Sequence, residues 1–408
     1  MIHVCYGLND KTGYYSKFTG TSMLSLFENI SAAPPSVTVH ILHDNTLSQA
    51  NYEKFVYIAG KYGQIVKFHN VEKLCLDKLK FLWEKLNSVF SSRFSAGCFY
   101  RLMVDKKFFQ PDDVSKIIYL DSDTIINMDI AELWNYPMNG ATLAAVPELQ
   151  ATRGYMITNK HLLYTDQVKI ANYFCSGIMM IDLEKFDSDF FYKGVQWLSE
   201  NQKCECPDQD ILNYFFTDSY CKLPEKFDSF VGVSKSLDKN VLYKKIYHYA
   251  GWALGLDMKN AHDKLFFDNF VKTPWFSADF IENIHQIIRQ IYIEQKNFAV
   301  QTSAAISGKE RAFFITPNDI ETVKKVFEIT DKEEIIVADS QASIEKLYAA
   351  MRNCGGKKIY FIVITNPTVT QVLTQQGFIE GKDFINAIPY LTDAYGVPIP
   401  IQNIVRYL

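Results

Sequence analysis

Short apolar runs alternate with helical patterns along the first half of the chain, and this alternation constrains the fold more than any other feature. The apolar runs end in turn-forming or acidic residues, which is typical of buried strands. Between them, apolar residues recur at helical spacing. Such an order predicts an α/β fold with a doubly wound sheet, whose ligands bind at the carboxyl ends of the strands. The predicted strands are Ile2–Tyr6, Val37–Leu42, Ile65–His69, Ile117–Leu120, Leu143–Val146 and Phe174–Leu183, and the predicted helices are Phe18–Ile30, Asn51–Lys61, Ile130–Trp134 and Asp208–Phe216.

The pattern changes near residue 261. From there to residue 297 the sequence is helical and aromatic, and we predict that this segment extends a first domain spanning residues 1–297. Residues 298–309 are small and polar, as in linkers. A βαβαβ pattern then starts afresh and predicts a smaller α/β domain at residues 310–408. This domain lacks a G-x-G-x-x-G loop, so no second nucleotide site is indicated.

The composition and the termini exclude several classes of function. A formal net charge of −4 on 408 residues gives no basic surface for nucleic acid. The apolar runs are far shorter than the about 20 residues that span a bilayer. The N-terminus lacks the basic and apolar regions of a signal peptide, so we expect a cytoplasmic protein. Eight cysteines fit such a compartment as packed thiols, and the alternative is a zinc site at Cys204, Cys206 and Cys221.

Asp121, Ser122 and Asp123 directly follow the apolar run at residues 117–120. Alternate residues of a strand point to the same side, so both carboxylates can face one ligand. Two hard oxygen donors at a strand end suit Mg²⁺ or Mn²⁺ bound to a diphosphate. Acidic residues also commonly cap a strand or open a turn, so the pair by itself leaves both interpretations open.

Three further segments place polar side chains at the ends of predicted elements. Asp208 and Gln209 open a helix, either as its cap or as sugar-binding groups. His248 follows a strand, either as a buried core histidine or as a nitrogen ligand that completes a site for Mn²⁺. Arg101 is either an exposed helix residue or a cation beside a diphosphate.

Taken together and in this order, these segments resemble glycosyltransferase family 8, which comprises retaining enzymes with a GT-A nucleotide-sugar-binding fold. The resemblance runs from Ile2 to about Trp275. It implies that residues 1–297 form the catalytic domain, that the donor is a UDP-sugar, and that the cofactor is Mn²⁺, with Mg²⁺ as the alternative. The most specific motifs are Tyr119-Leu120-Asp121-Ser122-Asp123-Thr124, Tyr173-Phe174-Cys175-Ser176-Gly177-Ile178 and Asp208-Gln209-Asp210-Ile211-Leu212-Asn213.

The resemblance also implies a role for each matching residue. Asp121, Asp123 and His248 would bind the metal. Asp208 and Gln209 would be the catalytic pair beneath the donor sugar, with Gln209 facing the anomeric carbon. The implied donor-binding residues are Arg101, Asp121, Ser122 and Ser176. Tyr6, Asn9 and Tyr14 would contact the uridine, and Gly251 and Lys259 would bind the donor from the motif that begins at His248.

Three positions depart from the family pattern. Family members commonly have asparagine where this chain has Cys175, which removes one amide from the donor site. Leu254 occupies the position of the family's phosphate-binding lysine, and Lys259 or Lys272 is expected to replace it. The first loop carries Leu8 and one additional residue, which weakens the match at the uridine site.

The resemblance predicts transfer of a hexose from a UDP-sugar to a glycan acceptor, with galactose favoured over glucose. The similar bacterial enzymes extend O-glycans of serine-rich adhesins, so a protein-linked O-glycan is the expected acceptor. A non-catalytic sugar-nucleotide or glycan-binding module is the alternative, although the intact aspartates and His248 argue against it. A metal-dependent hydrolase would need a base and an attacking water that no motif identifies. For residues 310–408, acceptor binding, partner docking and structural support all remain open.

Overall fold

The computed structural model places most of the chain in two compact units, which are described separately. Ser277 ends the first unit, and the main part of the second begins at Ala278. The predicted boundaries at residues 297 and 310 remain predictions. No helix in the described part combines the length and apolar character needed to cross a membrane. The described residues are 1–86, 95–110, 112–148, 172–201, 206–232, 240–250, 260–286, 289, 306–317, 320–364 and 368–387.

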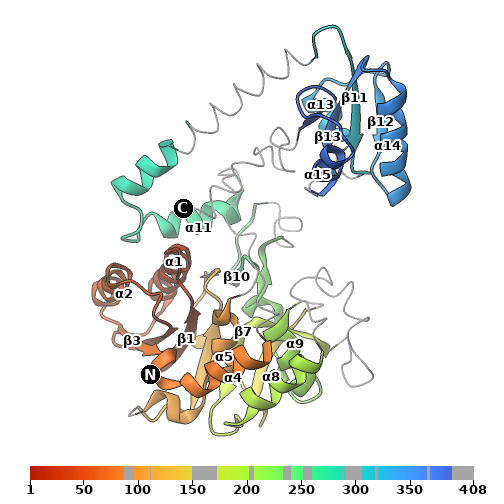
Figure 1. Ribbon diagram of the computed structural model, residues 1–408. Coiled ribbons are helices and arrows are strands. Elements are labelled where there is room, and N and C mark those ends of the chain that lie inside the picture. The colour runs from red at the N-terminus through yellow and green to blue at the C-terminus, as the bar shows by residue number, and fades with distance from the viewer. Residues whose placement is uncertain are drawn as a thin grey trace. The chain divides into compact units, whose positions relative to one another are not determined.

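A mixed β-sheet forms the centre of the first unit (Figure 1). Among the described residues it has seven strands in the order β3-β2-β1-β4-β7-β6-β8. The β1, β2, β3 and β4 strands run parallel, whereas β7 runs antiparallel to both β4 and β6. The α/β fold predicted from the alternating pattern is therefore confirmed. The strands are β1 (Ile2–Leu8), β2 (Val37–His43), β3 (Ile65–Asn70), β4 (Lys116–Leu120), β6 (Leu143–Pro147), β7 (Phe174–Asp182) and β8 (Cys221–Lys222).

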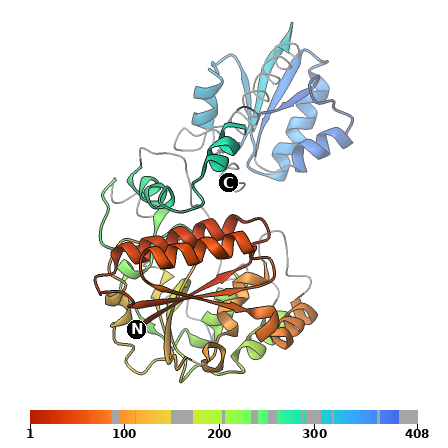
Figure 2. The ribbon, with the colours of Figure 1, turned by 90° about the vertical axis from the view of Figure 1, so that its left-hand side faces the viewer.

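Helices cover both faces of this sheet (Figure 2). The α1 and α2 helices lie on one face, and α4, α5, α8 and α9 lie on the other. The helices of the first unit are α1 (Tyr14–Asn29), α2 (Gln49–Lys61), α3 (Val71–Leu74), α4 (Leu76–Leu86), α5 (Tyr100–Met103), α6 (Ala131–Trp134), α8 (Phe190–Glu200), α9 (Pro207–Phe216) and α11 (Ala261–Phe270), with short 3-10 helices η1 (Ala96–Phe99), η2 (Lys106–Phe109) and η5 (Glu225–Phe227).

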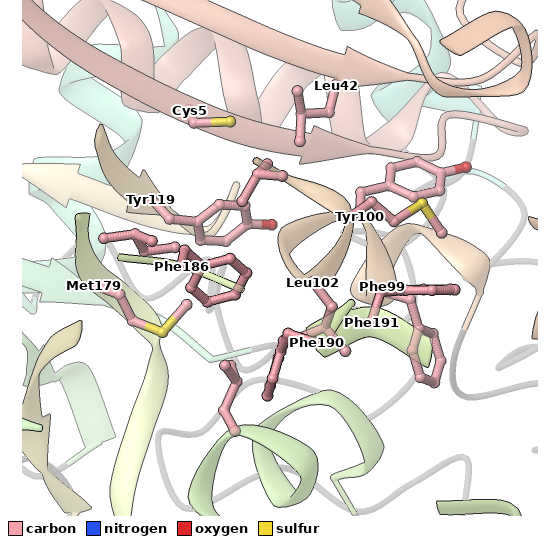
Figure 3. Packing of buried hydrophobic residues seen from close by; sticks show 14 of the residues in the cluster. Cys5, Leu42, Phe99, Tyr100, Leu102, Tyr119, Met179, Phe186, Phe190 and Phe191 are labelled. Carbon is pink, nitrogen blue, oxygen red and sulfur yellow. The ribbon is translucent and has the colours of Figure 1, made fainter. Parts of the chain in front are cut away.

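Aromatic side chains fill the core between the sheet and the second helical face. Cys5 of β1 and Tyr119 of β4 point from the sheet toward Tyr100 and toward Phe190 and Phe191 at the start of α8 (Figure 3). Each of these side chains is almost completely buried. Burial of aromatic surface on this scale dominates the energetics of a core. The packing holds α5, which carries Arg101, against the strands.

A second, smaller sheet closes the carboxyl end of β4. Within the described residues it consists of β5 (Thr124–Ile126), β10 (Ile246–His248) and β9 (Ser229–Phe230), in the order β5-β10-β9. The β5 and β10 strands are antiparallel, and β10 and β9 are parallel. This sheet brings segments more than 100 residues apart to the end of β4.

The second unit is a parallel α/β layer, as its βαβαβ pattern predicted. Its described strands lie in the order β12-β11-β13-β14, and all neighbouring pairs are parallel. Buried clusters line both faces of the sheet, which is typical of parallel sheets. The strands of this sheet and the helices between them are β11 (Glu310–Ile315), α13 (Ile320–Val326), β12 (Glu334–Val337), α14 (Gln341–Asn353), β13 (Lys358–Val363), α15 (Thr368–Gln375) and β14 (Phe384–Asn386).

Candidate active site

The three predicted metal ligands lie together at the end of β4. Nε2 of His248 is 3.7 Å from Oδ2 of Asp121 and 3.6 Å from Oδ1 of Asp123. One ligand atom from each residue lies within 4.8 Å of the other two. Two carboxylate oxygens and one imidazole nitrogen form a donor set that suits Mn²⁺. Their role as metal ligands remains a prediction.

The two carboxylates reach this arrangement through a turn. Asp121 and Asp123 lie between β4 and β5, so the strand alternation expected from the sequence is not what aligns them. The β5–β10 pairing sets His248 opposite Thr124, one residue beyond Asp123. The Tyr249 N–H also donates to the Asp123 carbonyl over 2.9 Å. Long-range strand pairing therefore positions the histidine.

Gly177 of β7 leaves the space in which these three side chains meet. A Cβ atom on Gly177 would lie 2.2 Å from Cε1 of His248 and 2.9 Å from Oδ2 of Asp121. Both distances are below normal contact, so only glycine fits here without a shift of its neighbours. The same strand holds the turn, because the Asp121 N–H donates to the Gly177 carbonyl over 2.7 Å. The donor set and this clearance together fit a divalent ion.

Arg101 joins the aspartate turn to the start of α9. Its Nη1 donates to the carbonyl and the hydroxyl of Ser176 over 2.8 and 3.0 Å. Its Nη2 donates to Oδ1 of Asp121. Its Nε lies 3.1 Å from Oδ2 of Asp208 but off line for a hydrogen bond, so this contact is an ion pair. The guanidinium stacks over the Tyr119 ring at 4.7 Å and is buried, which excludes the exposed helix residue considered above.

Burial governs the protonation of these groups. It raises the pKa of Asp121 to about 6, and although Arg101 opposes this shift, Asp123 adds to it. Burial also raises the pKa of Asp208, again opposed by Arg101. For Arg101 itself, burial lowers the pKa, but Asp121 and its other neighbours more than offset that effect and hold the value well above the ordinary one. The arginine is therefore a permanent cation in the site.

Gln209 is fixed at both ends of its amide. Its Oε1 accepts the Ser176 N–H over 3.0 Å, and its Nε2 donates to Oε2 of Glu148 and to the Tyr173 hydroxyl over 3.0 and 3.1 Å. Tyr173 in turn donates to Asp210 over 2.6 Å. The side chain is buried in this network. Its amide is thus held in one orientation against β7.

The helix that carries these residues begins where its sequence favours a start. Pro207 occupies the first turn of α9, where its missing N–H costs nothing. Asp208 and Asp210 follow it, and acidic groups there interact favourably with the helix dipole. The capping and functional interpretations of Asp208 are thus compatible, since the same carboxylate also pairs with Arg101.

The residues predicted at the uridine differ in exposure. Asn9 and Tyr14 are partly exposed, at the end of β1 and the start of α1. The Asn9 amide donates to Asp44. Tyr6 has no exposed surface, and its hydroxyl pairs with Ser22 over 3.0 Å. Asn9 and Tyr14 therefore have exposed surface, whereas Tyr6 has none.

Buried hydroxyl groups attach α1 to the aspartate turn. Thr19 donates to the Ser122 hydroxyl over 2.8 Å. The Ser22 and Thr124 hydroxyls lie 2.9 Å apart, and Thr124 donates to the Asp121 carbonyl over 2.9 Å. Ser122, predicted to contact the donor, is therefore engaged with the helix.

Two predicted donor contacts fall outside the described residues, namely Gly251 and Lys259, as does Leu254. Of the two candidate replacement lysines, the structure describes Lys272. Its Nζ forms an ion pair with Glu28 over 2.5 Å.

Two buried carboxylates of the site were not predicted from the sequence. Glu148 directly follows β6 and accepts a hydrogen bond from the Gln209 amide. An acidic residue after an apolar run was its signal, the same signal that marked Asp121. Asp228 lies 3.0 Å from Nδ1 of His248 and is fully buried. No local pattern marks Asp228, because its contact depends on the pairing of β9 with β10.

Comparisons with known proteins identify the family of this chain. The model of glycosyl transferase family 8 matches residues 3–253. The lipopolysaccharide 1,2-glucosyltransferase of Escherichia coli is 25% identical over 239 residues, which cover 54% of this chain and 68% of that protein. A Haemophilus influenzae protein, assigned to the glycosyltransferases without a stated substrate, is 27% identical over 295 residues, or 64% of this chain and 82% of that protein.

Among solved structures, the galactosyltransferase LgtC in complex with donor and acceptor sugar analogues is similar in fold. The TM-score is 0.51 at 17% identity, and the alignment covers 69% of this chain and 99% of LgtC. The first unit therefore has the GT-A fold that the motifs predicted. Since the family match spans more than half of the sequence and includes Arg101, Asp121, Asp123, Gln209 and His248, the chain belongs to glycosyltransferase family 8.

Proposed function

We propose that this glycosyltransferase moves a hexose from a UDP-sugar to a glycan hydroxyl and retains the α configuration, with Mn²⁺ as its cofactor. The observation that carries the proposal is the meeting of Asp121, Asp123 and His248 at one point, next to Arg101. A GT-A fold with acidic and imidazole ligands at the end of a strand suits a diphosphate and its metal.

The chain's own residues account for much of the proposed chemistry. Mn²⁺, when bound by Asp121, Asp123 and His248, would offset the charge that develops on the diphosphate. Arg101 is a buried, fixed cation beside this position, and a preorganised charge of this kind stabilises a developing anion without reorganisation. Its contacts with Ser176 and Asp208 hold it in place before any donor binds.

Gln209 and Asp208 are the proposed groups beneath the donor sugar. An amide is a poor covalent nucleophile compared with a carboxylate, so we favour attack by the acceptor on the face from which UDP departs. In this route the Gln209 carbonyl supports positive charge on the sugar, and the leaving phosphate takes the acceptor proton. The fixed orientation of the Gln209 amide supports such a role. Mass-spectrometric trapping of a glycosyl adduct on Gln209 or Asp208 would contradict this route.

The choice of sugar, acceptor and compartment extends the proposal. Similarity to a glucosyltransferase and to a galactosyltransferase supports a hexose donor, with galactose first and glucose next. We propose a protein-linked O-glycan as the acceptor, on the resemblance to enzymes that extend adhesin glycans. We also propose a cytoplasmic location, since the seven cysteines in the described part of the chain carry free thiols.

A donor panel tests the proposal directly. UDP release from UDP-galactose, UDP-glucose, UDP-N-acetylglucosamine and UDP-N-acetylgalactosamine is measured with and without Mn²⁺, in the presence of glycan acceptors. We expect Mn²⁺-dependent turnover of a hexose donor, and we expect Asp123→Ala to abolish it. Asp113→Ala is the matched control, because that carboxylate is exposed and pairs only with Lys106 among the described contacts. Absence of turnover with every donor would favour the non-catalytic binding module instead.

A further inference from the structure

The two nitrogens of His248 face different carboxylates. Nε2 points to Asp121 and Asp123, at 3.7 and 3.6 Å. Nδ1 points the other way, to Oδ1 of Asp228 at 3.0 Å. Asp228 has no exposed surface and does not belong to the aspartate turn. The histidine is therefore held between the predicted metal position and a separate, buried acceptor.

The fold places Asp228 there through backbone pairing. Asp228 ends η5 and immediately precedes β9, and its N–H donates to the Glu225 carbonyl over 3.0 Å. The β9 strand then runs parallel to β10, with Phe230 in register with His248. The carboxylate therefore lies directly before the strand that pairs with β10, within reach of the histidine.

Cys175 is the other neighbour of Nδ1. Its Sγ lies 3.8 Å away, and a thiol is a weak donor and a weak acceptor. Asp228 is 0.8 Å closer and, as a carboxylate, can only accept. Hydrogen bonds to an ionised group are about twice as strong as neutral ones. Nδ1 therefore carries the proton that Asp228 accepts.

We propose that Asp228 is a positioning residue that holds His248 as its Nδ1–H tautomer, so that the Nε2 lone pair faces the metal between Asp121 and Asp123. Metal-binding histidines commonly donate their second N–H to a carboxylate, which fixes both the tautomer and the plane of the ring. Gly177 adds to this restraint, because its missing side chain lets β7 lie directly against the ring. This inference rests on the proposed function, since it presumes a metal at Nε2.

Mn²⁺ affinity, measured by isothermal titration calorimetry on the full chain, tests the proposal. We expect Asp228→Ala to weaken Mn²⁺ binding by about 10- to 100-fold, the usual effect of removing such a partner. Asp228→Asn should retain an affinity near that of the unaltered protein, because its amide oxygen can still accept from Nδ1–H. Cys175→Ala should also leave the affinity nearly unchanged.

Turnover separates positioning from a general loss of structure. If Asp228 only positions the histidine, saturating Mn²⁺ should restore most of the kcat of Asp228→Ala, which a misfolded variant would not show. Unchanged Mn²⁺ affinity in Asp228→Ala, alongside a loss in Asp123→Ala, would overturn the positioning role alone. An equal loss in Asp228→Asn and Asp228→Ala would overturn the tautomer argument. If the unaltered protein and Asp123→Ala both fail to bind Mn²⁺, the metal assignment itself is wrong.

Discussion

Gly177→Ala tests whether the clearance beside His248 is required for metal binding. The new methyl group would lie 2.2 Å from Cε1 of the imidazole, whereas ordinary contact begins at 3.4 Å. The ring would have to move by about 1.2 Å, and a misplacement of about 1 Å at a reacting centre can cost about 10²-fold in rate. The ring has little room to retreat, because Asp228 and Cys175 lie behind Nδ1.

The substitution should therefore affect the site more than the fold. Overpacking of a core by a methyl group typically costs about 1–3 kcal/mol of unfolding free energy, which an enzyme of this size can tolerate. We expect Mn²⁺-dependent UDP release to fall by about 10²-fold, on the scale that such a misplacement predicts, and Mn²⁺ affinity to fall with it. Calorimetry and a donor-turnover assay measure the two quantities, and thermal unfolding shows whether the chain remains folded.

Gly60→Ala provides the matched control. Gly60 lies in α2, is exposed, and has no atom within 4 Å of an added Cβ. The same chemical change there should leave Mn²⁺ affinity unchanged and stabilise the helix by about 0.5–1 kcal/mol. A folded Gly177→Ala protein with ordinary Mn²⁺ affinity would refute the reasoning, because the three side chains would then not bind the ion in the arrangement described.

Three further predictions follow from the same geometry. Arg101→Met should lower the free energy of unfolding by about 3–5 kcal/mol in chemical denaturation, because the carboxylates of Asp208 and Asp121 would lose the cation that pairs with them. A loss below about 1 kcal/mol would contradict the buried ion pair. The pKa of Asp121, raised to about 6 by burial, predicts that Mn²⁺ affinity falls as the pH drops through about 6, because protons then compete with the ion for the carboxylate; affinity that is constant from pH 7 to pH 5 would contradict this. Removal of residues 310–408 should preserve donor hydrolysis, since every described site residue lies in the first unit; loss of transfer alone would assign acceptor binding to the second unit.

The periodicity of the sequence predicted most elements of the fold because it is a local signal. A strand that is buried on both faces of the sheet reads as a continuous apolar run, as at residues 117–120 of β4. The α8 helix went unpredicted, because its aromatic residues at 190–192 suit a strand as well as a helix. The three-residue strand β5 is too short for any period to show.

The candidate site was only partly predictable, for the same reason. Asp121 and Asp123 were found from their place after an apolar run, although a turn and not strand alternation brings them together. His248 was predicted from its place after a strand and from the family resemblance. Asp228 and Glu148 were not, because each acts through a contact that depends on tertiary structure, with His248 and with Gln209.

Arg101 explains why separate motifs form one site. Taken alone, each motif has an ordinary structural interpretation as a turn, a strand end or a helix cap. The buried guanidinium contacts all three at once, through Asp121, Ser176 and Asp208. A cation that is removed from water needs several partners to offset its desolvation, so the three segments must converge if Arg101 is to be buried. That convergence also leaves a fixed positive charge at the end of β4 beside two carboxylates, which is the arrangement that a diphosphate and its metal require.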